Sequence, residues 1–200
     1  MSTEFYIHFT PEYNDFLEEN VKKDYHYFNK PFGVLHWLKN NNGLVHDNDI
    51  IILLDPDMVY LSPFPQDFHK DAVFTNSDEQ PDLPRKYKVE HGTPFAQRYA
   101  FGNAWQRIDL NHVVGPDSPV HKISSNEADS HHPAGAPYMA TAKDMLKIVE
   151  RWSEVAPRVH DVYPELLAEM FGYIIAAADL GFKHQLIGEF LHFKISKNQI

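Results

Sequence analysis

The chain has 200 residues, of which 43% are hydrophobic, and a formal net charge of -10. A chain of this size can bury one sizeable core, so we expect a single domain over residues 1–200. The acidic balance and the absence of a Lys/Arg cluster argue against a nucleic-acid or anionic-membrane surface. The sequence has no cysteine, which excludes disulfides, thiolate zinc sites and cysteine nucleophiles. It also shows no targeting signal and no apolar run of the roughly 18 to 20 residues that a membrane span needs.

The N-terminal part of the chain predicts a strand, a helix and a turn, in that order. Alternating apolar residues indicate a short strand over Glu4 to Thr10, which the following proline ends. The next apolar residues follow helical spacing and Pro31 suits a first turn, so we expect a helix over Pro31 to Asn40. The polar residues at 40–42 and the following Gly43 then predict a turn.

The second predicted strand is the clearest secondary-structure signal in the sequence. Ile50 to Leu54 form an apolar run without alternation, which is typical of a strand covered on both faces. Such strands occur in the central parallel sheet of an α/β fold. Met58 to Leu61 can extend this strand before Ser62 and the prolines that follow end it.

A long segment rich in Pro, Gly, Asn, Asp and His follows, over residues 67–133. It contains short apolar islands at residues 72–74 and 113–114, so we expect one or two strands within an irregular excursion. Such segments often carry binding loops.

The C-terminal part of the chain predicts two helices and a final strand. Apolar residues with helical spacing indicate amphipathic helices over Lys143 to Val155 and Pro164 to Leu180. Phe182 to Ile195 resembles a strand or extended segment. Together with the earlier strands, these helices predict an α/β fold.

The acidic residues Asp55 and Asp57 directly follow the predicted buried strand. This position should bring both carboxylates to the edge of the sheet where open α/β folds place their ligands. In an Asp-x-Asp arrangement the hard oxygens can bind Mn²⁺ or Mg²⁺, and the ion can neutralise the diphosphate of a nucleotide sugar. A plain strand-ending turn is the alternative interpretation, because Asp and Pro are common in turns.

Several ordered blocks stand out in the sequence: Asn29–Leu38, Ile50–Asp57, Gly135–Met139, Trp152 and Ala168–Tyr173. They resemble the plant and algal group of hydroxyproline O-arabinosyltransferases and peptidyl-serine alpha-galactosyltransferases. The resemblance implies a GT-A type fold, with a Rossmann-like mixed sheet and flanking helices, a UDP-sugar donor and retention of anomeric configuration. It also implies a location in the secretory pathway, in the Golgi or the ER lumen. Family members carry a first nucleotide-binding strand and a membrane anchor before Glu4, so we expect an incomplete N-terminus that lacks this first strand.

Small or aromatic residues provide further candidates for binding the donor. Gly135 and Ala136 are small and Pro137 fixes a turn, so the backbone there could approach a sugar or an acceptor closely. The alternative for these three residues is a plain loop before the next helix. Trp105 lies in the irregular segment and is the tryptophan best suited to stack on a sugar.

Two further polar residues are candidates for the chemistry. Glu169 occurs within an otherwise apolar helix, where burying an unpaired carboxylate is costly. It could hold a sugar hydroxyl, act as a nucleophile or stabilise positive charge in the transition state; a structural partner for a buried Arg or His is the alternative. His184 follows a helix at a position where GT-A enzymes often supply a third metal ligand, and the alternative is a core or surface histidine.

These observations predict a retaining, metal-dependent glycosyltransferase that moves a sugar from a UDP-sugar to a Ser or hydroxyproline hydroxyl of a peptide or glycoprotein. Asp55, Asp57 and His184 would bind Mn²⁺ or Mg²⁺, and Asp57 and Glu169 would be the catalytic residues. The alternative function is a non-catalytic module that binds a glycan or a protein. A metal-dependent phosphohydrolase would also need an acidic strand end, but the sequence lacks the accompanying motif.

Overall fold

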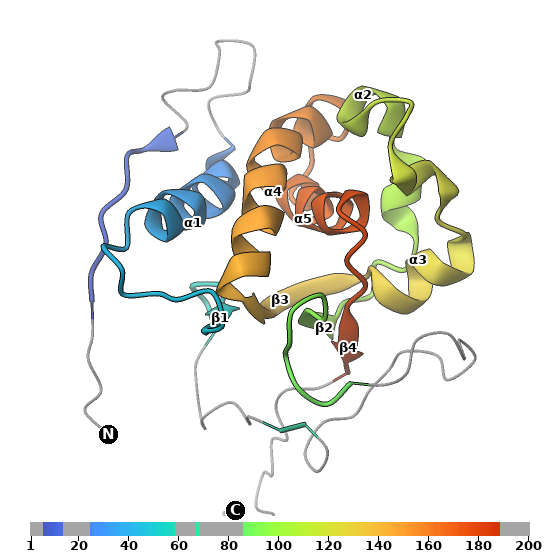
Figure 1. The fold of residues 1–200 in the computed structure, drawn as a ribbon. Helices are drawn as coiled ribbons and strands as arrows, with labels where there is room; N and C mark the ends of the chain where they lie inside the picture. Colours follow the sequence, from blue (N-terminus) through green and yellow to red (C-terminus); the bar gives the residue numbers. More distant parts are fainter. Residues whose placement is uncertain (1–5, 14–24, 59–66, 69–85, 189–200) are drawn as a thin grey trace, which may run out of the picture.

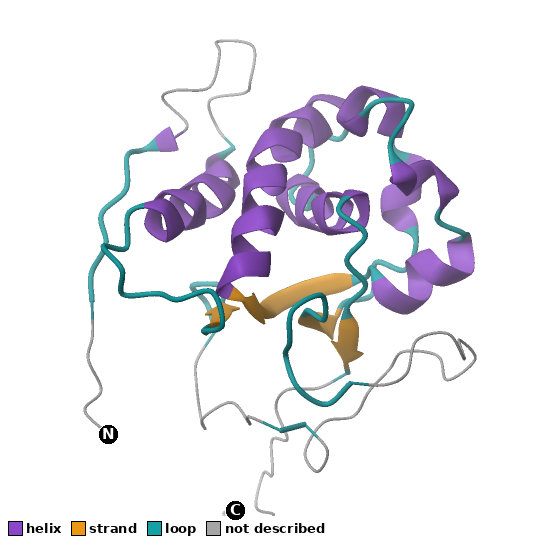
Figure 2. Ribbon diagram, in the orientation of Figure 1, coloured by secondary structure: helices purple, strands orange, loops and turns teal. Residues whose placement is uncertain are grey.

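Helices cover one face of a small mixed sheet in this protein, as Figure 1 and Figure 2 show. The structure is a computed structural model, and it describes residues 6–13, 25–58, 67–68 and 86–188. None of the helices in these ranges has both the length and the hydropathy of a membrane-spanning helix. The described elements, in chain order, are η2 (His26–Phe28), α1 (Asn29–Lys39), β1 (Ile50–Leu53), β2 (Phe95–Arg98), η3 (Ala104–Arg107), α2 (Leu110–Val114), η4 (Pro119–Lys122), α3 (Ser125–His131), β3 (Ala134–Thr141), α4 (Ala142–Val162), α5 (Ala168–Asp179) and β4 (Gln185–Ile187).

The sheet has the strand order β1-β3-β2-β4 among the described residues. β3 pairs antiparallel with β1 on one side and with β2 on the other, whereas β2 and β4 are parallel. All eight residues of β3 are buried, because helices cover one face and a second apolar cluster covers the other. Phe68, Phe95, Met139 and Ile187 form that second cluster. The sheet is therefore mixed and compatible with a Rossmann-like fold.

The strand predicted at Ile50 is confirmed, but its predicted place in a central parallel sheet is wrong. β1 lies at the edge of the described sheet, runs antiparallel to its neighbour and leaves Ile50 44% exposed. Ile51 packs into the helix-side core and Ile52 against the cluster on the opposite face. A β-branched run indicates a strand but not its number of neighbours. The strand that is buried along its whole length is β3, part of which could also be interpreted from the sequence as a plain loop.

The strand predicted over Glu4 to Thr10 does not form in residues 6–10, which have no regular secondary structure. Glu4 itself lies outside the described residues. Tyr6 and Ile7 are exposed, and Phe9 is 85% exposed. Alternating apolar residues need a neighbouring strand before they form a sheet, and none of the described strands pairs with this segment.

The three predicted helices are confirmed with shifted ends. α1 matches the prediction closely, and the turn after it is confirmed by positive φ angles at Asn42 and Gly43. α4 continues past the predicted end, Val155, to Val162. It stops there because Tyr163 precedes Pro164, and a residue before proline is disfavoured in a helix. α5 begins only at Ala168 rather than at Pro164.

The described part of the irregular excursion contains a strand, as expected, and more helix than its composition suggested. One strand, β2, is confirmed, but the island at residues 113–114 lies in the short helix α2. Asp109 caps this helix by accepting a hydrogen bond from the backbone N–H of His112. The island at residues 72–74 lies outside the described residues. The predicted final strand is confirmed as β4, and the end of its predicted range also lies outside them.

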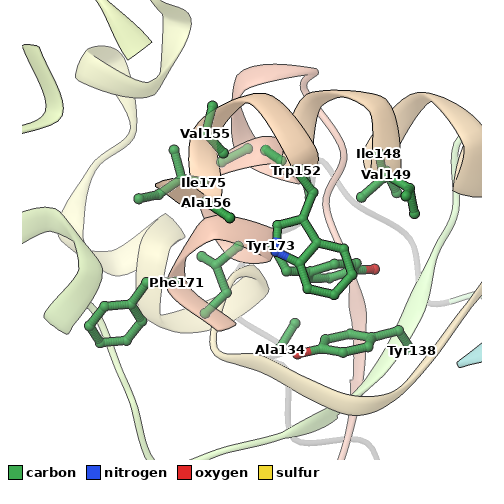
Figure 3. Close-up of a cluster of buried hydrophobic side chains, with 14 of the residues drawn as sticks. Ala134, Tyr138, Ile148, Val149, Trp152, Val155, Ala156, Phe171, Tyr173 and Ile175 are labelled. Carbon is green, nitrogen blue, oxygen red and sulfur yellow. The ribbon is translucent and has the colours of Figure 1, made fainter. Parts of the chain in front are cut away.

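Close packing of α4 on α5 forms the centre of the core (Figure 3). The Trp152 ring meets the Tyr173 ring edge-on, with 5.2 Å between the ring centroids. The centroid of the Tyr173 ring lies 3.8 Å from that of Tyr138 in β3. A Cβ at Gly172 would lie 3.0 Å from the Cα of Ala156, so glycine allows the two helices to approach this closely. Burying a large apolar side chain stabilises a fold by about 1.5–3 kcal/mol. This core fixes α5, and with it Glu169.

Candidate functional site

Three charged residues from distant parts of the chain meet beside the end of β1. The Nζ atom of Lys30 in α1 lies 2.6 Å from Oδ1 of Asp55 and 3.0 Å from Oε1 of Glu169 in α5. Lys30 and Asp55 are largely buried, and the Glu169 side chain is only 2% exposed. We call these three residues the carboxylate cluster. The predicted candidates Asp55 and Glu169 are thus brought together, by a lysine to which the sequence analysis gave no role.

The backbone of Glu169 is fixed on both sides. Its N–H donates to the Tyr25 hydroxyl at 2.8 Å, and its carbonyl oxygen accepts from Nε1 of Trp152 at 2.8 Å. The first bond satisfies an N–H group in the first turn of α5, where a helix has no internal partner for it. The Tyr25 hydroxyl also donates to the carbonyl oxygen of Leu166, which joins this residue to the chain entering the helix. These bonds therefore hold the backbone of Glu169 in place independently of its side-chain contacts.

Burial and charge act against one another in the carboxylate cluster. Burial raises the pKa of Glu169 to about 7, although the nearby Lys30 ammonium works in the opposite direction. Burial works to lower the pKa of Lys30, but the two carboxylates outweigh it, and the pKa lies above its ordinary value. Oδ1 of Asp55 and Oε1 of Glu169 both face the Lys30 ammonium and are shielded from solvent. The lysine is therefore the shared partner of the two carboxylates.

Two tyrosines border the carboxylate cluster. Burial, followed by the charges of Asp55 and Asp57, raises the pKa of Tyr99, which follows β2. The wholly buried Tyr138 has a pKa well above 10, first because of burial and then because of the charge of Glu169. Its hydroxyl has no hydrogen-bond partner among the described residues. Two phenol groups therefore lie within electrostatic range of the acidic residues.

The structure does not assemble the predicted metal site of Asp55, Asp57 and His184. Asp57 is exposed on the turn after β1, and Asp55 faces Lys30. Within the described ranges, no group of three or more His, Cys, Asp or Glu side chains is arranged to hold a metal ion. Asp55 and Asp57 alone still fit Mn²⁺ or Mg²⁺ chemically, since Mg²⁺ usually binds one or two carboxylates and completes its shell with phosphate oxygens and water.

The small residues Gly135, Ala136 and Pro137 lie on the buried central strand β3, not in an open loop. The Tyr99 ring occupies the space beside Gly135, and a Cβ at that position would overlap it. The close approach that the sequence predicted is therefore made by a side chain of the same protein, and the structure places no open surface for a sugar at these three residues. The strand was missed because its small residues lack the β-branched pattern of β1.

His184 and Trp105 both lie in the interior rather than at the carboxylate cluster. His184 is wholly buried, and its Nε2 lies 3.2 Å from the Tyr173 hydroxyl. Trp105 is 0% exposed and meets the ring of His132 edge-on at 5.7 Å, so it cannot stack on a sugar in this structure. Burial lowers the pKa of His184 to about 3 and holds that of His132 well below 6.5. We call His131, His132 and His184 the histidine cluster.

Lys30 and Tyr99 are the residues of this site that sequence reasoning missed. Lys30 stands in one of the blocks that resemble glycosyltransferases, next to Pro31, and that position was its one sequence signal. Nothing in the sequence near Tyr99 indicates its place, because it depends on the pairing of β2 with β3. The positions of both residues at the site therefore depend on the tertiary fold.

Comparisons with known proteins give one distant relative. No family model and no solved structure matches the chain. The chain is 25% identical over 163 residues to a peptidyl serine alpha-galactosyltransferase of Arabidopsis thaliana, a match that covers 79% of this chain and 18% of the relative. The chain thus corresponds to a small part of the relative's length. At this level of identity, the comparison supports a distant relationship between this chain and a glycosyltransferase.

Proposed function

We propose that this chain carries the sugar-transfer site of a retaining glycosyltransferase, with a UDP-sugar as donor and a Ser or hydroxyproline hydroxyl of a peptide as acceptor. The observation that carries the proposal is the carboxylate cluster, which joins Asp55 at the end of β1 to the buried Glu169. The distant relationship to a glycosyltransferase supports the same reaction class. The GT-A type of fold and a secretory-pathway location belong to this proposal.

In the proposed reaction, the bond between the anomeric carbon and the leaving phosphate oxygen breaks while a bond to the acceptor oxygen forms on the same face. The proton of the acceptor hydroxyl passes to the leaving diphosphate, so no separate strong base is needed. Positive charge develops on the sugar ring in such a transition state. The Glu169 carboxylate, whose backbone is held by Tyr25 and Trp152, stabilises this charge.

The proposed donor anchor is the pair Asp55 and Asp57. Asp57 is exposed, and Asp55 contacts Lys30 through Oδ1, so the carboxylate of Asp57 and the other oxygen of Asp55 would bind a divalent cation shared with a diphosphate. Bound Mn²⁺ or Mg²⁺ would neutralise negative charge on the departing diphosphate. His184 has no part in this arrangement, because it is buried in the histidine cluster.

The test measures donor binding and donor hydrolysis by the purified chain. We expect calorimetry to detect UDP binding that requires Mn²⁺, and a panel of UDP-sugars to contain one that is slowly hydrolysed. Asp57→Asn should weaken this binding at least tenfold, whereas Asp117→Asn, a change at another exposed turn aspartate, should leave it unchanged. The proposal fails if UDP does not bind, and metal-independent binding of a glycan would instead identify a non-catalytic module.

A further inference from the structure

The position of Lys30 is unusual for a lysine in a helix. Lys30 is the second residue of α1, where the N-terminal end of the helix dipole disfavours a positive charge. The side chain is nevertheless largely buried, and it meets carboxylates from two other elements. Helix preference therefore does not explain this lysine, whereas its pairing with Asp55 and Glu169 does.

Lys30 fixes the separation of the two carboxylates. Oδ1 of Asp55 and Oε1 of Glu169 contact the same nitrogen atom, so its size and bond directions set the distance between these oxygens. The two acids come from segments more than a hundred residues apart in the sequence. An ammonium group has three N–H donors, of which these contacts engage two. The third donor can meet a ligand held between the acids.

The backbone contacts of Glu169 leave the direction of its carboxylate unset, and Lys30 contacts that carboxylate. Tyr25 and Trp152 fix the main chain of Glu169, but neither contacts its carboxylate in the bonds described above. The Lys30 contact at 3.0 Å fixes the direction of that carboxylate. A buried carboxylate that lost this partner would turn or take up a proton, because an isolated charge is costly to bury.

We propose that Lys30 is a positioning residue for sugar transfer: by pairing with both acids, it holds Glu169 at the distance from Asp55 that a sugar diphosphate spans. This inference rests on the proposed function, in which the diphosphate is held at Asp55 and the anomeric carbon faces Glu169. Lys30 acts through these acids and not as a reacting group. Reacting groups that are misplaced by about 1 Å can lose about 10²-fold in rate.

The test compares Lys30→Gln with Lys30→Arg and with Lys147→Gln, a change at an exposed lysine of α4. For each variant, kcat and KM for the hydrolysed UDP-sugar are measured per folded molecule, together with Mn²⁺-dependent UDP affinity. We expect Lys30→Gln to lower kcat about 10²-fold and to leave UDP affinity within about threefold. Lys30→Arg, which can still bridge two carboxylates, should recover at least tenfold of this loss, and Lys147→Gln should resemble the parent.

Two results with folded Lys30→Gln overturn the inference. Unchanged kcat in folded Lys30→Gln would make the lysine structural, and a loss of UDP affinity equal to the loss of kcat would make it a phosphate ligand. If the parent chain binds UDP but no variant differs in turnover, the proposed function stands while this inference falls. If the parent binds no UDP, the proposed function fails; a double-mutant cycle of Lys30→Gln with Glu169→Gln in urea unfolding would then identify a purely structural ion pair.

Discussion

The carboxylate cluster and the histidine cluster are both buried and ionisable, but they accommodate burial in opposite ways. In the carboxylate cluster ion pairing offsets burial, since Lys30 lies between Asp55 and Glu169. In the histidine cluster burial holds the pKa values below 6.5, so the imidazoles are neutral at pH 7. The ring of His132 illustrates the difference, because neither of its nitrogens has a hydrogen-bond partner among the described residues.

This difference separates the part of the molecule suited to chemistry from the part suited to packing. A charge that is held in a buried, water-poor site can stabilise charge that develops in a reaction. The neutral imidazole of His132 packs edge-on against Trp105 and that of His184 lies near Tyr173, so these rings fill volume in the core instead. We therefore expect changes in the first cluster to affect turnover, and changes in the second to affect stability alone.

The largest expected effect is on turnover in Glu169→Gln. The amide keeps the shape of the side chain but removes the charge proposed to stabilise the sugar cation, so kcat should fall about 10²–10³-fold. The KM for the donor should change little, because the diphosphate anchor is elsewhere. Steady-state hydrolysis of the UDP-sugar measures both constants, and Glu165→Gln, at an exposed position before α5, is the matched control. An unchanged kcat would remove Glu169 from the reaction.

The next effect is the loss of stability in Lys30→Met, which should depend on pH. At pH 8 this change leaves a buried carboxylate without its counter-ion and should lower the free energy of unfolding by about 3 kcal/mol. At pH 5.5 the loss should be smaller, because Glu169 already has a pKa of about 7 beside Lys30 and takes up a proton readily without it. Urea unfolding at both pH values tests this, with Lys147→Met as the control. An equal loss at both would show that Glu169 does not respond to Lys30.

Local sequence signals predicted the elements of this fold better than their arrangement. The apolar run at Ile50 and the amphipathic pattern of α4 each identified an element, because strands and helices have different apolar periods. The central strand β3 was missed since its Ala and Gly residues carry no strand signal, although close packing against Tyr99 requires them. The β-branched residues of β1 carry that signal, so the sequence indicated β1 as the buried strand.

The candidate site shows the same limit of local signals. Asp55 and Glu169 were found because acids at a strand end and within an apolar helix stand out in the sequence. Lys30 was not found, because its pairing with them depends on how the tertiary fold brings α1, α5 and the residues after β1 together. His184 and Trp105 were misplaced because a lone histidine or tryptophan carries no information on burial, and both lie in the core.

The third effect is a pH dependence in which the two clusters oppose one another. The folded-state pKa of His184 lies far below its ordinary 6.5, so the unfolded chain binds the proton first and stability falls as the pH drops below 6.5. Glu169 has a folded-state pKa raised from 4.5 to about 7, so its protonation adds stability as the pH falls through 7 toward 4.5.

Glu169→Gln removes the second contribution and isolates the first. Between pH 6.5 and 4.5, its free energy of unfolding should therefore fall more steeply than that of the parent, by about 1.4 kcal/mol for each pH unit. Urea unfolding across this range gives the two slopes, and Glu165→Gln should retain the slope of the parent. Parallel slopes for Glu169→Gln and the parent would mean that Glu169 is already ionised throughout this range in the folded protein.

The smallest expected effect is a gain of stability in His132→Leu. His132 is 1% exposed, and its two ring nitrogens lose water on folding without gaining a partner in the described structure. An apolar side chain of similar volume avoids that cost, so the free energy of unfolding should rise by about 1 kcal/mol at pH 7. The gain should be larger at pH 5, where the unfolded parent binds a proton that the folded protein excludes.

The exposed residue His46 provides the control, because His46→Leu should change stability by less than about 0.5 kcal/mol. UDP-sugar hydrolysis by His132→Leu should equal that of the parent, since the histidine cluster has no part in the proposed reaction. A loss of stability would instead indicate that a buried water bonds to the imidazole, and the variant would then leave that water without its partner. In that case the histidine cluster would be a satisfied polar network, and the contrast with the carboxylate cluster would rest on charge alone.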